Sequence, residues 1–104
     1  MKDIIATTSI GEGLDFACNL VSVSLSEVAR QKPNLMKELL HYLTSYIVYR
    51  YAGEEELALE CLKLLGEYTN NTPLFQQKQF WAQLIWVAEQ MDVSKVEYEQ
   101  HYSK

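Results

Sequence analysis

The chain has 104 residues, of which 48% are hydrophobic and 22% are charged. This length and composition support one folded domain, and they exclude a disordered or collagen-like protein. We therefore expect residues 1–104 to form a single domain. Nine basic and fourteen acidic residues give a formal charge of −5, which disfavours direct binding to the phosphates of nucleic acid.

Cys18 and Cys61 are far apart in the chain and form no CxxC pair. A disulfide scaffold or a thiolate metal site therefore has no support, and both residues are expected to behave as small buried hydrophobic side chains. Asp3 and the polar run at 7–9 interrupt the apolar start of the chain, so no signal peptide is predicted. No uncharged apolar run has the length of about 18 residues that a membrane span needs. The expected location is cytoplasmic, without a membrane partner.

The first helix is predicted from about Ser9 to Gln31. Ser9 and Glu12 have the spacing of a capping box, and Pro33 prevents the helix from continuing. Apolar residues that recur every three or four positions predict a buried face. A second apolar row lies about half a turn away, so a neighbouring helix or a partner must cover it. The buried face contains Leu14, Ala17, Cys18, Val21, Leu25, Val28 and Ala29, and the second row contains Phe16, Leu20 and Val23.

The second helix is predicted over about 34–51, and it carries two apolar rows. Only a narrow polar strip separates them, which is typical of a helix surrounded by others. We therefore expect this helix at the centre of the fold, with Gly53 ending it in a left-handed conformation. The first row is Leu35, Leu39, Tyr42, Tyr46 and Tyr49, and the second is Met36, Leu40, Leu43, Ile47 and Tyr51.

The third helix begins with three glutamates at 54–56, where the positive end of the helix dipole favours negative charge. Its outer face is expected to be acidic, with Lys63 as the single compensating cation. The outer acidic residues are Glu56, Glu60 and Glu67. The predicted buried face contains Leu57, Ala58, Cys61, Leu62, Leu64, Leu65 and Tyr68.

The fourth helix is predicted from Pro73 to about Met91, with Thr72 as its N-cap. Most of its apolar residues form one wide face. Phe75, Ala82 and Trp86 instead lie on the opposite, glutamine-rich face, which also holds Gln79. Exposed aromatic residues often mark association sites. Either this face binds a partner, or the first helix or the C-terminal tail covers it.

The tail predicts a short fifth helix. Ser94 and Glu97 have the spacing of a second capping box, and Val93 and Tyr98 have that of a hydrophobic staple. The connections between the predicted helices are only a few residues long, which favours antiparallel neighbours. The expected fold class is all-α: an up-and-down bundle of four helices plus a short C-terminal helix.

Catalytic chemistry has little support. Glu38 and His41 lie one helical turn apart, as in helical di-iron sites, but such a site needs a second copy and two further carboxylates. Both cysteines fall on apolar helix faces, which raises a thiol pKa and leaves it unreactive. We expect no enzyme activity, no cofactor and no metal.

The leading hypothesis is a non-enzymatic protein-binding domain that inhibits or neutralises a basic partner protein. Its size, acidity and helical content are similar to those of bacterial immunity and antitoxin proteins. The alternative is a structural bundle or adaptor that homodimerises through the exposed aromatic face. The predicted partner-binding residues are Phe75, Gln79, Ala82, Trp86, Glu55, Glu56 and Glu60.

Overall fold

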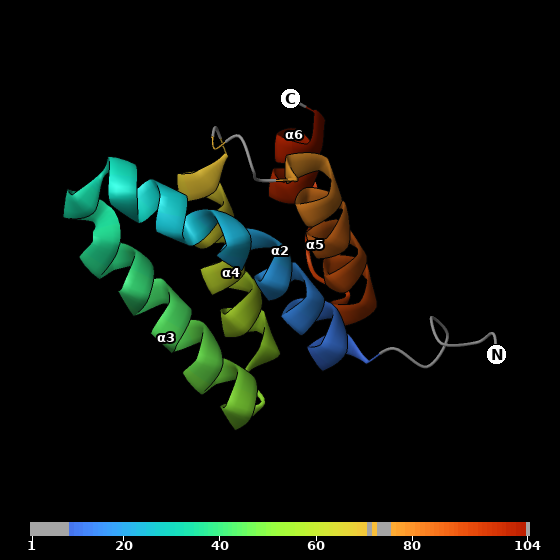
Figure 1. Cartoon of the computed structure of the whole chain (residues 1–104). Helices are drawn as coiled ribbons and strands as arrows, with labels where there is room; N and C mark the ends of the chain where they lie inside the picture. The colour runs from blue at the N-terminus through green and yellow to red at the C-terminus, as the bar shows by residue number, and fades with distance from the viewer. Residues whose placement is uncertain (1–8, 71, 73–75, 104) are drawn as a thin grey trace, which may run out of the picture.

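The structure is a computed structural model, and it describes residues 9–70, 72 and 76–103. The long helices alternate in direction and form an up-and-down bundle of four with a short helix at the C-terminal end, so the predicted fold class is confirmed (Figure 1). The elements are α2 (Ile10–Gln31), the 3-10 turn η1 (Pro33–Leu35), α3 (Met36–Ala52), α4 (Glu55–Thr69), α5 (Gln77–Met91) and α6 (Val96–Ser103).

Two predicted helix boundaries follow directly from local chemistry. The Ser9 hydroxyl accepts a hydrogen bond from the Glu12 backbone N–H at 3.1 Å, and the Glu12 carboxylate accepts one from the Ser9 N–H at 3.0 Å. This is the complete capping box, which satisfies two of the free N–H groups at the start of α2. Gly53 ends α3 with φ of 77°, the left-handed conformation that glycine adopts without strain.

The predicted start of the fourth helix is wrong. Gln76 has φ of −86° and ψ of 78°, which is not helical, and α5 begins at Gln77. The Thr72 N–H donates to the Thr69 carbonyl at 2.9 Å, so Thr72 closes a turn after α4. Pro73 and Phe75 lie outside the described residues.

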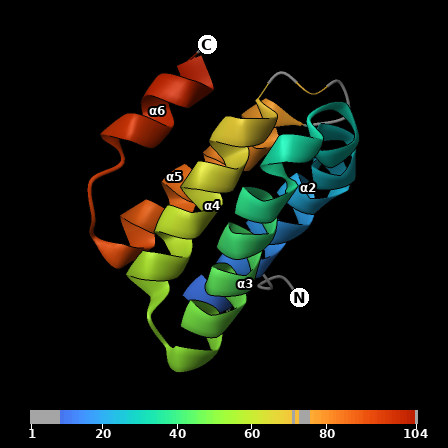
Figure 2. The same cartoon turned by 90° about the vertical axis from the view of Figure 1, so that its left-hand side faces the viewer.

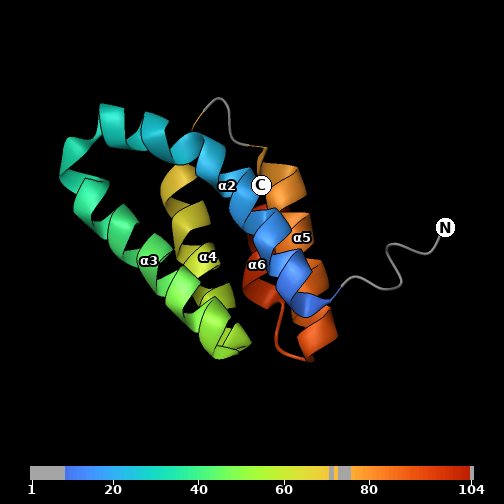
Figure 3. The same ribbon diagram turned by 60° about the horizontal axis from the view of Figure 1, so that its bottom comes forward.

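The centre of the bundle is α4, not α3. Figure 2 shows α4 between α3 and α6, and Figure 3 shows α2 crossing the pair formed by α4 and α5. Eight residues of α4 are buried, whereas only Leu39 and Tyr46 are buried in α3. The prediction that the helix over 34–51 is surrounded by others is therefore wrong. The first of its apolar rows faces α4, and the second remains largely exposed.

Asp15 on α2 joins α2 to the end of α3. It accepts a hydrogen bond from the Tyr46 hydroxyl at 2.7 Å, and both of its oxygens accept from the Arg50 guanidinium at 3.2 Å. Burial, followed by the neighbouring Asp15 carboxylate, raises the pKa of the Tyr46 phenol, so this hydroxyl remains a donor at neutral pH. The paired carboxylate and guanidinium leave little net charge at this end of α3.

None of the described helices is long and apolar enough to cross a membrane.

Candidate protein-binding site

An open cleft of about 600 Å³ lies between the first half of α4 and the segment that leads into α6. It combines acidic walls with apolar side chains. The lining residues are Glu54, Glu56, Leu57, Leu59, Glu60, Val93, Ser94, Glu97 and Tyr98.

The position of α6 determines the geometry of this cleft, and a polar cluster around Trp81 fixes α6. The Trp81 ring stacks on His101 with 4.2 Å between ring centres, and its N–H donates to the Asn70 side-chain carbonyl at 3.0 Å. His101 also lies 3.1 Å from a Glu67 carboxylate oxygen. Trp81 is fully buried, so the C-terminal half of α6, which contains His101, packs on an aromatic ring that belongs to the core. Tyr98 and Glu97 are thereby held at the edge of the cleft.

Lys63 lies beneath the acidic wall and contacts two of its carboxylates. Its Nζ is 2.8 Å from Glu97 and 2.9 Å from Glu60, and the residue is only 8% exposed. The hydrogen bond from Lys63 and the positive charge of its ammonium hold the pKa of Glu97 below its ordinary value of 4.5. Hydrogen bonds to these carboxylates likewise raise the pKa of Lys63. Four lining glutamates against this one lysine leave an excess of three negative charges.

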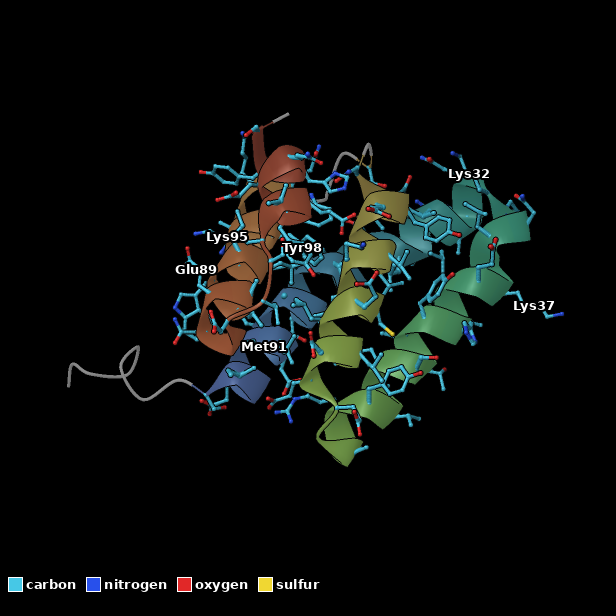
Figure 4. The ribbon with its side chains drawn as sticks, turned by 180° about the vertical axis from the view of Figure 1, so that it is seen from behind. Lys32, Lys37, Glu89, Met91, Lys95 and Tyr98 are labelled. Carbon is cyan, nitrogen blue, oxygen red and sulfur yellow. The ribbon has the colours of Figure 1, made fainter. Side chains whose placement is uncertain are left out.

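The apolar part of the cleft comes from both sides. Leu57 on α4 is about half exposed, whereas Tyr98 on α6 is buried. Figure 4 shows Tyr98 pointing from α6 toward α4. Burial, followed by the charge of Glu60, raises the pKa of the Tyr98 phenol to about 12. A neutral hydroxyl therefore lies among the carboxylates at physiological pH, beside aliphatic surface.

The structure brings together some of the predicted acidic residues. Glu56 and Glu60 line the cleft, but Glu55 does not. Sequence reasoning missed the contributions of Glu54 and Glu97. The only sequence pattern that included Glu97 was the second capping box, which predicted that its carboxylate would contact the backbone near Ser94. In the structure the Glu97 carboxylate instead pairs with Lys63, and the Ser94 hydroxyl reaches the Val96 N–H only at 3.5 Å.

The aromatic face of α5 is partly covered by α2. Trp86 is half-buried, and a side-chain carbon built at Gly13 would lie 2.6 Å from its ring. The Gln83 amide donates to the Gly13 carbonyl at 3.1 Å beside it. Of the two alternatives for Trp86, cover by the first helix is the one the structure shows. Gln79 and Ala82 remain exposed, and binding of a partner by these three residues stays a prediction.

Comparison with models of protein families, with curated proteins and with solved structures finds no match. The geometry of the site therefore carries the functional argument. Within the described residues, no group of three or more His, Cys, Asp or Glu side chains is placed to hold a metal ion. Burial raises the pKa of both cysteine thiols, Cys18 and Cys61.

The pair of Lys63 and Glu97 predicts a stability that depends on pH. Folding lowers the pKa of Glu97. The stability that this pair contributes is therefore fully present when the pH is above the ordinary pKa of a glutamate, and it is lost as the pH falls through the lowered pKa of the folded protein. We expect urea midpoints to fall when the pH drops from neutral to below 4.5. Glu97→Gln should show a smaller fall than the wild type. Equal pH dependence in the two proteins would contradict a folded-state role for this pair.

Proposed function

We propose that this domain is a non-enzymatic protein-binding module that holds a basic segment of another protein in the cleft between α4 and α6. The observation that carries the proposal is the pairing of excess negative charge with apolar surface in one cleft. An arginine or lysine side chain has the same two parts, an aliphatic stem and a charged end. An inhibitor or neutraliser of a basic protein, of the immunity or antitoxin kind, is the function this chemistry favours.

The cleft residues divide into two roles. Leu57 and Val93 offer aliphatic surface for the stem of a basic side chain, whereas Tyr98 lines the cleft but is itself buried. Glu54 and Glu56 have no ion pair among the described residues, so their carboxylates are open to an incoming cation. Burial of apolar surface sets most of the affinity, whereas charges at the rim chiefly set the association rate and its salt dependence.

The test begins with a pull-down from a cell extract, using the wild-type protein and Glu56→Lys. We expect the partner to be retained by the wild type at low salt and released at high salt. Reversing the charge at Glu56 should slow association by roughly tenfold at low salt, because a rim charge acts through electrostatic steering. Surface plasmon resonance of the captured partner measures this rate.

Glu38→Lys is the matched control. It makes the same change of charge on α3, where the Glu38 carboxylate accepts a hydrogen bond from Tyr68 at 3.1 Å and lies outside the cleft. Both variants lower the net negative charge equally, so only a local role separates them. If Glu38→Lys slows association as much as Glu56→Lys does, the effect comes from net charge, and the cleft is not the binding site.

A further inference from the structure

Four of the five residues in the second apolar row of α3 are exposed, and the fifth, Leu43, packs partly against the core. Met36 and Ile47 are each 46% exposed, Leu40 is 55% exposed and Tyr51 is 88% exposed. Single exposed apolar residues are normal on a protein surface, but a continuous row along a helix marks an association site. This row is the one that misled the sequence prediction about the centre of the fold.

A shallow groove beside this row extends the apolar surface onto α2. The groove has a volume of about 190 Å³. It lies near the end where η1 connects α2 to α3, and the two helices spread apart from that end in Figure 1. It is lined by Leu25, Ser26, Ala29, Met36, Leu39, Leu40 and Leu43. No charged side chain lines it, so its natural occupant is an apolar helix surface.

The spacing along the row is that of a helix pair. Met36, Leu40, Leu43 and Ile47 follow one another at steps of four, three and four residues. This is the alternation of core positions in a coiled coil, in which each side chain enters a space between residues of the facing helix. A row of this kind is narrower than the apolar face that packs a helix into its own domain.

The charge around the row permits contact with a second copy of the same chain. Two copies of a protein with a charge of −5 repel one another over most of their surfaces. Glu38 is the one carboxylate of α3, and it lies against Tyr68 on α4. Lys37 borders the row and points away from the bundle in Figure 4. Because Asp15 is paired with Arg50, two such faces can meet without bringing free carboxylates together.

We infer that two copies of the chain dimerise through this face, with their α3 helices packed antiparallel about a two-fold axis beside Leu43 and Thr44. This register places Leu40 opposite Ile47 of the second copy, and Met36 opposite Tyr51. The pairing is self-complementary, as a two-fold interface requires. The row shares no residue with the acidic cleft, so dimerisation and binding in the cleft are compatible and independent.

The dimensions of the face suit a weak dimer. A helix of 17 residues is about 25 Å long and two packed helices are about 20 Å across, which gives a face on the order of 500 Å² in projection. A standard interface buries about 800 Å² of accessible surface on each partner. The face is smaller than a standard interface, so we expect the dimer to be weak and to depend on protein concentration.

The experiment measures oligomeric state by sedimentation equilibrium on the full chain and on paired variants of Leu40 and Ile47. Two glutamates, in Leu40→Glu with Ile47→Glu, bring like charges together in the proposed register. They should raise the dimer dissociation constant by about 100-fold or more. Leu40→Glu with Ile47→Lys brings opposite charges together in the same register, so it should dimerise distinctly better than the double-glutamate variant.

Val23→Glu is the matched control, because Val23 is 59% exposed on α2 and does not line the groove. This variant should dimerise like the wild type. Circular dichroism melting confirms that each variant is folded. A wild-type chain that stays monomeric at all concentrations overturns the inference. The inference is also overturned if the double-glutamate variant dimerises as well as the wild type, or if the two paired variants have the same dimer dissociation constant.

Discussion

Leu62→Ala is expected to lower the free energy of unfolding by about 2–5 kcal/mol. Leu62 lies on α4 and is fully buried. Removing its side chain therefore loses the free energy of burying those carbon atoms and leaves a cavity between helices that cannot close completely. Urea unfolding followed by circular dichroism measures the change.

Leu40→Ala is the matched control, since it removes the same atoms from α3, where the side chain is 55% exposed. In the monomer, Leu40→Ala should lower the free energy of unfolding by much less than Leu62→Ala does, because little apolar surface is lost from the core. Both variants should be unfolded at a protein concentration low enough to keep the chain monomeric. If the two substitutions destabilise the monomer equally, α4 is not the centre of the fold.

Gly66→Ala is expected to lower the free energy of unfolding by about 1–3 kcal/mol, even though alanine has the higher helix propensity. A side-chain carbon built at Gly66 would lie 2.3 Å from a ring carbon of Phe80 and 3.0 Å from the ring of Trp81. Both rings are fully buried, so neither moves without disturbing the contacts between α4 and α5. The close approach of these two helices depends on the missing side chain.

Gly11→Ala provides the control for helix propensity. The three atoms nearest to a carbon added at Gly11 all belong to the guanidinium of Arg50, which is the end of a long side chain and can shift at some cost to its hydrogen bonds with Asp15 and the Gly11 carbonyl. Alanine is better than glycine in a helix by about 1 kcal/mol, which offsets that cost, so this substitution should be close to neutral. A Gly66→Ala protein that melts at or above the temperature of Gly11→Ala would contradict the tight packing of α4 on α5.

The cleft and the row on α3 also explain why the sequence could be read only in part. Glu56 and Glu60 follow the helical repeat of one element, so their shared face was predictable. Glu97 reaches the same cleft from a different helix, 37 positions after Glu60 in the chain. Its place depends on the contact of α6 with Trp81, and no local pattern contains that contact.

The sequence by itself determined the elements of this protein. The capping box at Ser9 and Glu12, the left-handed Gly53 and the three-to-four-residue apolar repeat act within a few positions of the chain, so they can be recognised without knowing the fold. Together with the short connections, they predict the all-α bundle.

Only the tertiary structure decided which apolar surface each helix buries. Trp86 is partly covered because Gly13 lets α2 approach it, and α5 packs closely on α4 because Gly66 has no side chain. The row from Met36 to Tyr51 has the same hydrophobicity as a core face, yet it lies on the outside. Apolar burial has no direction and no preferred partner. A hydrophobic pattern therefore predicts that a helix surface will be buried, but only the tertiary packing determines whether the same chain or another one buries it.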